Sequence, residues 1–129
     1  MRISKKSQYA LRSLVCLSKT DGFLSLKSIS EKEKISFDYL EKIFSKLEKD
    51  GLVKSKRGVS GGYSLAKKPE DIRIGEVLRS LEGEIALVEC MGSKHCSRKK
   101  DCPTIGVWQK LQDSLEKTID SIRLKDLIK

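Results

Sequence analysis

The sequence predicts a mainly α-helical fold with a small β-hairpin, arranged as a winged helix-turn-helix domain plus a long C-terminal dimerisation helix. Three observations favour this fold. Apolar residues recur at helical spacing in two segments before residue 50, and the pattern then changes to two strand-like runs around a glycine-rich turn. A longer amphipathic segment occupies the C-terminal part of the chain.

Three helices are expected first, at residues 5–19, 26–34 and 37–49. Ser25 and Ser36 precede the second and third helices, and serine is a preferred N-cap because its hydroxyl accepts a hydrogen bond from a first-turn amide. Four residues of the third helix have the i, i+3, i+4, i+7 spacing of a single buried face: Leu40, Ile43, Phe44 and Leu47.

A β-hairpin is expected next, with strands at residues 52–56 and 63–66. The connecting residues 57–62 contain three glycines and are typical of a flexible turn. In this order of elements the third helix would enter the major groove of DNA and the hairpin would be the wing.

The remaining helices are expected at residues 74–82 and 104–122. On the longer one, three apolar residues are seven apart, which permits a seam between two helices: Trp108, Leu115 and Ile122. We therefore divide the chain into a winged helix-turn-helix DNA-binding domain (1–83), a cysteine-rich cluster-binding loop (84–103) and a dimerisation helix with its tail (104–129).

The charge distribution favours a polyanionic partner. The chain carries a formal net charge of +9. Residues 1–68 hold 16 Lys and Arg against 7 Asp and Glu, whereas residues 69–129 hold 11 of each, which together give the totals of 27 and 18. An excess confined to the first half suggests attraction to the phosphates of DNA or RNA, and the alternative is a solvated, lysine-rich surface. The predicted winged helix-turn-helix makes double-stranded DNA the expected partner.

The same composition argues against a membrane protein, because no run of 18 apolar residues is present. The N-terminal segment lacks the continuous apolar region of a signal peptide, so we expect a cytoplasmic protein. In a reducing compartment, four cysteines favour metal or redox chemistry over structural disulfides.

Three of these cysteines are evenly spaced, as Cys90-x5-Cys96-x5-Cys102. Closely spaced thiolates are a ligand set for iron–sulfur clusters or zinc, and zinc would use His95 as a fourth ligand. The alternative is a set of reduced cysteines without metal, or an adventitious disulfide. Cys16 lies among apolar residues of the first helix, so core packing is expected there and a ligand or sensor role is the alternative.

Candidate DNA contacts lie on the third helix and the turn of the hairpin. Lys42 and Lys46 would meet phosphates, and Glu41 would accept a hydrogen bond from a cytosine amino group. The full set comprises Ser36, Asp38, Tyr39, Glu41, Lys42 and Lys46 on the helix, with Arg57, Gly58 and Ser60 on the wing. A solvated helix face is the alternative for these residues.

Several motifs, in order, resemble the IscR/NsrR/CymR superfamily of bacterial winged-helix regulators, also called the Rrf2 superfamily. They are Met1-Arg2-Ile3-Ser4, Tyr39-Leu40-Glu41, Gly51-Leu52-Val53, Arg57-Gly58-x-x-Gly61-Gly62-Tyr63, Leu81-Glu82-Gly83 and the cysteine triplet leading into Trp108. The resemblance implies a homodimer on a roughly palindromic operator. It also implies that Arg57 enters the minor groove and that Glu41 discriminates between operator classes.

Many members of this superfamily hold an iron–sulfur cluster on three cysteines and one further ligand. In the IscR-type branch the fourth ligand is a histidine three residues after the third cysteine, but the chain has Ile105 at that position. In the nitric-oxide-sensing branch an aspartate near the start of the first helix takes part, and the chain has Gln8 there. The three thiolates carry over, whereas the fourth ligand does not.

The expected function is therefore a homodimeric transcriptional repressor whose operator binding is controlled by an iron–sulfur cluster. A 2Fe-2S cluster is favoured, with 4Fe-4S or zinc as alternatives. The competing hypothesis is a cluster-free, CymR-like repressor controlled by a partner protein, a metabolite or thiol oxidation. We do not expect an enzyme, because the chain has no Cys-x-x-Cys pair and only one histidine.

Overall fold

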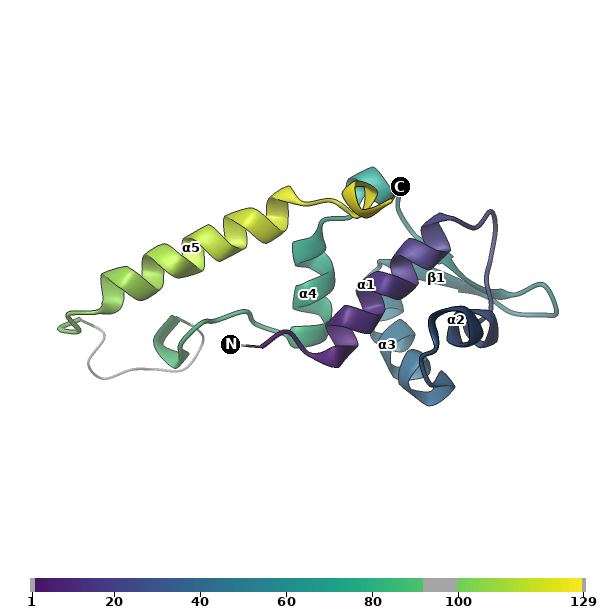
Figure 1. Cartoon of the computed structure of the whole chain (residues 1–129), viewed down its shortest axis with the longest axis horizontal. Coiled ribbons are helices and arrows are strands. Elements are labelled where there is room, and N and C mark those ends of the chain that lie inside the picture. The colour runs from purple at the N-terminus through teal and green to yellow at the C-terminus, as the bar shows by residue number, and fades with distance from the viewer. Residues whose placement is uncertain (1, 92–99, 129) are drawn as a thin grey trace.

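The computed structural model describes residues 2–91 and 100–128, and its helices and hairpin follow the order that the sequence predicts (Figure 1). The longer elements, in chain order, are α1 (Lys5–Ser18), α2 (Leu26–Glu33), α3 (Phe37–Lys49), β1 (Val53–Lys56), β2 (Gly62–Leu65), α4 (Ile74–Glu82) and α5 (Ile105–Ser121). Three short 3-10 helices were not expected: η1 (Pro69–Asp71), η2 (Glu89–Met91) and η3 (Leu124–Leu127). No predicted helix or strand boundary is wrong by more than one residue.

The two serine caps explain why the predicted helix starts are accurate. Ser25 Oγ accepts a hydrogen bond from the amide of Ser28 at 3.1 Å, and Ser36 Oγ accepts one from the amide of Tyr39 at 3.2 Å. The predicted face of α3 is fully buried and forms the centre of the core: Leu40, Ile43, Phe44 and Leu47. This burial fixes the direction of the opposite face of α3, which is exposed.

The hairpin joins the core through its inner face. β1 and β2 pair antiparallel, with Val53 opposite Leu65, and the ring of Tyr63 lies 4.9 Å from that of Phe44. Leu24 pairs with the other edge of β2 through a single-residue bridge. Its amide donates to the carbonyl of Tyr63 at 2.9 Å, and its carbonyl accepts from the amide of Tyr63 at 2.8 Å. The loop between α1 and α2 is therefore attached to the wing.

Figure 1 shows α5 as a long arm that leaves the winged-helix domain on the side opposite the hairpin. Its C-terminal end packs on α4, where Ile119 forms a small apolar cluster with Ile74 and Leu78. The chain then returns to the domain, because the amide of Leu124 donates to the carbonyl of Ile72 at 2.8 Å and its side chain is fully buried. No helix in the described ranges is long and apolar enough to cross a membrane.

Candidate nucleic-acid interface and cysteine segment

The exposed face of α3 forms an open groove whose lining residues are all polar or charged. It is lined by six side chains: Asp38, Glu41, Lys42, Ser45, Lys46 and Lys49. The structure thus brings together four of the predicted contacts on this helix, with three cations facing two carboxylates. A surface of this kind suits phosphate contacts from the lysines and hydrogen bonds from the shorter polar groups to base edges.

Two predicted contacts at the start of α3 have partners within the protein. Ser36 is exposed, but its Oγ caps the helix by accepting the Tyr39 amide. The ring of Tyr39 lies edge-on against Tyr9 of α1, with centroids 5.4 Å apart and planes at 79°. The body of Tyr39 therefore also packs on the core, and only part of this side chain is exposed.

The far end of α3 is tied to α4 by Asp50. Its Oδ2 accepts a hydrogen bond from Ser80 Oγ at 2.5 Å and lies 3.0 Å from Lys46 Nζ. The hydrogen bond from Ser80, and then the one from Lys46, lowers the pKa of the Asp50 carboxyl. Lys46, a candidate phosphate contact, is thus held by the same carboxylate that links the two helices.

The turn of the hairpin is exposed along its whole tip. Arg57, Gly58 and Ser60 all lie on the surface, and Val59 between them is fully exposed. The amide of Gly61 closes the turn by donating to the carbonyl of Gly58 at 3.0 Å. A turn with an exposed apolar residue two positions after an arginine has a shape that can enter a groove of DNA.

Two cysteines of the triplet are described, and they lie at the two ends of the cysteine segment, residues 90–102. Cys90 is half-buried within η2, and Cys102 precedes α5 with its Sγ 3.1 Å from Thr104 Oγ1. The predicted ligand Cys96 and the alternative ligand His95 lie outside the described residues. Among the residues that are described, no three His, Cys, Asp or Glu side chains are grouped closely enough to hold a metal ion.

Sequence reasoning missed the residue that anchors this segment, Gln112 of α5. Its side chain is 6% exposed and bonds the backbone on both sides of Ala86: Oε1 accepts from the Leu87 amide at 2.9 Å, and Nε2 donates to the Ile85 carbonyl at 2.6 Å. A glutamine among the apolar residues of an amphipathic helix was the available signal, because a buried amide needs hydrogen-bond partners.

Neither position that the superfamily uses for a fourth ligand provides a strong donor here. Ile105 begins α5 and has no donor atom in its side chain. Gln8 of α1 is exposed, and its Nε2 donates to the carbonyl of Ile3 at 3.1 Å. A fourth ligand to a metal would therefore differ from the histidine and the aspartate that these two branches use.

Cys16 is half-buried rather than part of the fully buried core. It lines a groove between α1 and α2, and burial, followed by the nearby Glu33 carboxylate, raises the pKa of its thiol. A raised pKa keeps the thiol protonated at neutral pH, which makes it a poor nucleophile or ligand. This environment favours the packing role over the sensor role.

A serine-capped helix with an exposed polar face, followed by a basic hairpin, defines a winged-helix DNA-binding protein. Residues 3–129 match the Rrf2 family, described as iron-dependent transcriptional regulators. The chain belongs to this family.

Relatives and solved structures agree with this assignment. IscR, an HTH-type transcriptional regulator of Escherichia coli, is 37% identical over 130 residues, which is 99% of this chain and 80% of IscR. The structure of IscR from T. potens is 38% identical with a TM-score of 0.76, over 98% of this chain and 85% of that one. CymR, the global cysteine regulator of B. subtilis, is 36% identical with a TM-score of 0.80, over 98% and 95%.

These relatives are transcriptional regulators, which confirms the expectations of DNA binding in transcription regulation and of a protein that is not an enzyme. The predicted superfamily and fold class are confirmed as well.

Proposed function

We propose that the chain is a homodimeric transcriptional repressor whose operator binding is controlled by an iron–sulfur cluster on Cys90, Cys96 and Cys102. The observation that carries the proposal is the anchoring of the cysteine segment at both ends to α5. Gln112 bonds the backbone just before this segment, and Cys102 lies directly before the first turn of α5. Ordering of the segment would therefore act on a helix that packs on the DNA-binding domain.

For DNA, each predicted residue has a role that its chemistry supports. Lys42 and Lys46 meet phosphates, while Glu41 reads a cytosine amino group in the major groove. Asp38, Ser36 and Tyr39 lie at the N-terminal end of α3, which approaches the sugar–phosphate backbone. Arg57 enters the minor groove, and Gly58 and Ser60 let the wing backbone approach the DNA closely.

For the cluster, the donor set fits in type and number. Three thiolates within 13 residues satisfy three of the four positions that such clusters need, and the lysine- and arginine-rich segment between them offsets negative charge. When bound, the cluster supplies a redox-sensitive group, with 2Fe-2S favoured over 4Fe-4S and zinc. Since Ile105 has no donor atom, the fourth ligand differs from that of the IscR-type branch.

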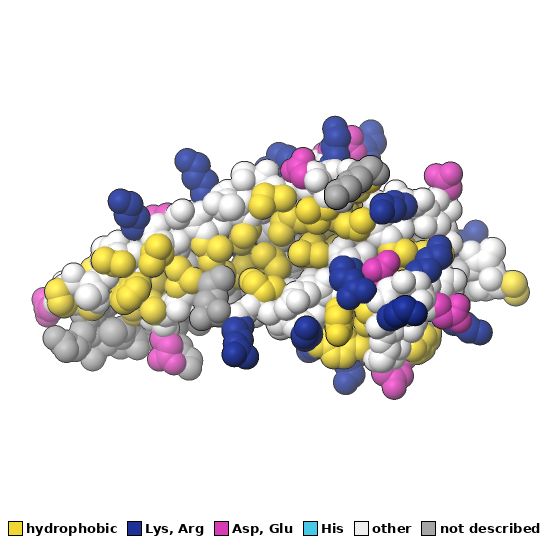
Figure 2. Space-filling model, viewed as in Figure 1, with side chains coloured by type: hydrophobic (Ala, Val, Ile, Leu, Met, Phe, Trp, Pro, Cys, Tyr) yellow, Lys and Arg dark blue, Asp and Glu magenta, His cyan; other side chains and the backbone are white. Residues whose placement is uncertain are grey.

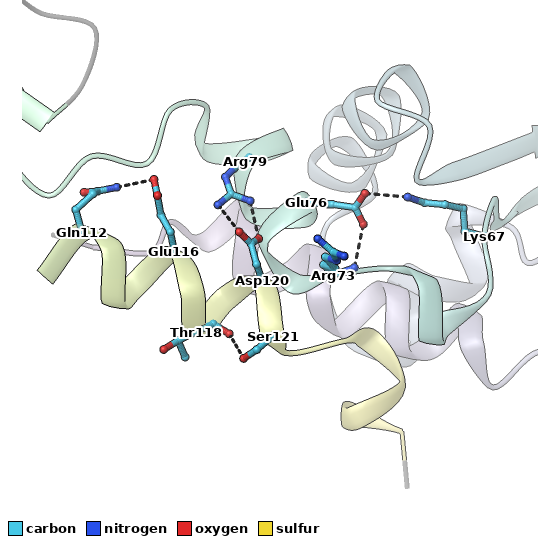
Figure 3. A network of polar contacts seen from close by, with 9 residues as sticks. All are labelled: Lys67, Arg73, Glu76, Arg79, Gln112, Glu116, Thr118, Asp120 and Ser121. Carbon is cyan, nitrogen blue, oxygen red and sulfur yellow. Dashed lines mark hydrogen bonds and ion pairs between the residues drawn. The ribbon is translucent and has the colours of Figure 1, made fainter. Parts of the chain in front are cut away.

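Polar contacts offer a route from this segment to α3. Figure 3 shows Gln112 bonded to Glu116 at 3.0 Å and, one turn further along α5, Asp120 bonded to Arg79 of α4. The next residue of α4 is Ser80, which bonds Asp50 at the end of α3. We propose that the order of the cysteine segment biases the placement of α5 and α4, and through them the groove of α3.

The exposed apolar face of α5 supports the homodimer. Figure 2 shows a band of hydrophobic side chains along the α5 arm, where Val107 and Leu111 are 54% and 49% exposed. An isolated helix arm with such a face is unfavourable in water, and two copies would bury it. A dimer would also present two α3 helices to successive half-sites.

The second candidate is a cluster-free repressor of the CymR kind, controlled by a partner protein, a metabolite or thiol oxidation. Two observations favour it: the chain covers 95% of B. subtilis CymR with a TM-score of 0.80, and Ile105 replaces the expected histidine ligand.

Anaerobically purified protein tests these two candidates through its visible absorption and its iron and sulfide content per chain. The proposal expects a coloured protein whose absorption is lost in Cys102→Ser and in Cys90→Ser but is kept in the matched control Cys16→Ser. Operator affinity should differ between loaded and stripped wild-type protein. A colourless, iron-free protein with unchanged operator affinity would support the cluster-free candidate instead.

A further inference from the structure

The outer face of the hairpin carries two lysines of β1. Val53 is buried and Tyr63 of β2 packs on Phe44, so the row of residues that includes them faces the core. Since strand residues alternate between faces, Lys54 and Lys56 lie on the opposite, exposed face. Both lysines are thus presented on the same side of the wing, immediately before its tip.

Phe23 brings the ends of these two side chains to one place. Its ring centroid lies 6.0 Å from Lys54 Nζ and 5.7 Å from Lys56 Nζ, so both ammonium groups contact one aromatic ring. The negative face of an aromatic ring attracts ammonium groups at such distances. These contacts also restrict two flexible side chains before any ligand binds.

The position of Phe23 depends on a close approach of two backbones. Leu24, the next residue, bridges to Tyr63, which places the loop beside β2. At Gly62 a Cβ atom would lie 2.3 Å from the carbonyl oxygen of Leu24, so a side chain there would push the loop away. Gly62 also has a φ of +144°, which favours glycine.

The charge of this patch is uncompensated. None of the ion pairs between described residues includes Lys54 or Lys56. The carboxylate of Glu48 is bonded instead by Ser55, whose side chain lies on the other face of the strand. Two ammonium groups at one ring repel each other, and an anion between them would relieve that repulsion.

We propose that Phe23, Lys54 and Lys56 form a second phosphate-binding site for the DNA backbone, beside the groove that Arg57 enters. This inference rests on the proposed DNA-binding function, because Arg57 directly follows Lys56 and carries the site to the duplex. The two lysines bind phosphate oxygens, and Phe23 is a positioning residue that holds them. The ligand is sequence-independent, so the site adds affinity rather than operator choice.

Salt dependence of binding tests the proposal. The full-length protein selects a duplex from a random-sequence library, and fluorescence anisotropy gives its affinity over a range of KCl concentrations. In K54A/K56A the slope of log K against log[KCl] should fall in magnitude by about two units, because each lost phosphate contact removes about 0.9. The matched control K110A/K117A, with two exposed lysines of α5 replaced, should keep the wild-type slope.

The role of Phe23 has its own readout. F23L keeps both lysines and an apolar side chain, and we expect binding about threefold weaker, because the two ammonium groups are then no longer held at one place before the DNA binds. In the K54A/K56A background the same substitution should change affinity no further, since the groups that Phe23 positions are already absent. An equal effect of F23L in both backgrounds would assign Phe23 a purely structural role and would overturn its proposed positioning of the two lysines.

Failure of the site and failure of the proposed function give different results. If R57A weakens binding while K54A/K56A keeps the wild-type slope, the DNA-binding function stands and the phosphate site is wrong. An acidic protein partner for the patch would give that same result. If the wild-type protein selects no duplex at all, the proposed function itself fails. Circular dichroism of each variant verifies that it is folded.

Discussion

Arg79 of α4 and Asp120 of α5 form a bidentate ion pair, with Nη1–Oδ1 and Nη2–Oδ2 distances of 2.7 and 3.0 Å (Figure 3). The two residues are 41 positions apart, so this contact fixes the α5 arm relative to the DNA-binding domain. Paired hydrogen bonds of this kind define orientation as well as distance. The pair therefore couples the placement of α5 to that of α4, which is the coupling that the proposed control of DNA binding requires.

The first prediction concerns acid stability. The hydrogen bond from Arg79 lowers the pKa of Asp120 below the value of about 3.9 expected in the unfolded chain, against the opposing effect of burial. The ionised carboxylate therefore stabilises the folded state above about pH 4, and this contribution is lost as the pH falls through the lowered folded pKa. In D120N the free energy of unfolding should depend less steeply on pH between about pH 5 and 2.

Urea unfolding followed by circular dichroism at several pH values measures this slope. At neutral pH we expect D120N to cost no more than about 1 kcal/mol, because both side chains are more than one-third exposed to solvent. The control is D113N, which removes an exposed carboxylate of the same helix that joins none of the ion pairs between described residues. Equal slopes for D120N and wild type would contradict the stabilising role of the pair.

The second prediction concerns Gly75, which lies beneath this ion pair. A Cβ atom there would be 1.9 Å from Asp120 Oδ1 and 2.7 Å from Arg79 Nη1. Alanine normally stabilises a helix relative to glycine by up to about 1 kcal/mol. We expect G75A to give no such gain in the wild type, because the new methyl group displaces the carboxylate, but to stabilise the D120A variant.

A double-mutant cycle measured by urea unfolding isolates this coupling, which we expect to be about 1 kcal/mol. In the D120A background, G75A gains the stability that alanine adds to a helix. In the wild-type background, the same substitution disrupts the Arg79–Asp120 ion pair and loses that gain. If G75A changed stability equally in both backgrounds, the contact between Gly75 and Asp120 would have no energetic role.

Local signals explain what the sequence could predict of the fold. The caps Ser25 and Ser36 and the spacing of Leu40 and Leu47 act within one or two helical turns, so α2 and α3 were predicted to within a residue. The return of η3 was missed because the Leu124–Ile72 hydrogen bond joins residues 52 positions apart. No local pattern around residue 124 encodes that pairing.

In the candidate site too, local patterns were predictable and contacts between residues far apart in the sequence were not. The α3 face that carries Lys42 and Lys46 followed from helical periodicity, and the cysteine triplet followed from spacing alone. Gln112 and Phe23 were missed because each acts on residues that only the folded chain brings near: a backbone segment about 26 residues earlier and a strand about 30 residues later.

The third prediction concerns Gln112. Q112A removes the partners of the Leu87 amide and the Ile85 carbonyl, which should cost about 1–3 kcal/mol of stability. If Gln112 transmits the state of the cysteine segment, the ratio of operator affinities between loaded and stripped protein should move toward one. Anisotropy titrations on both forms measure that ratio, and iron content per chain verifies that loading is unchanged.

Q109A provides the matched control, since Gln109 is an exposed residue of the same helix. It should retain the wild-type ratio and stability. A wild-type affinity ratio in folded, fully loaded Q112A would exclude the route through α5.

The fourth prediction concerns the oligomeric state. Leu111 is 49% exposed on α5 beside the 54% exposed Val107, and a charge within a buried apolar interface is strongly unfavourable. L111E should therefore convert a dimer to a monomer, whereas Q109E adds the same charge about 200° around the helix and should leave the dimer intact. Sedimentation velocity gives the mass of each variant. A monomeric wild type would contradict the homodimer, and a dimer that survives L111E would place the interface elsewhere. In the expected case, L111E should also lose most operator affinity, since two half-sites are then no longer bound as a unit.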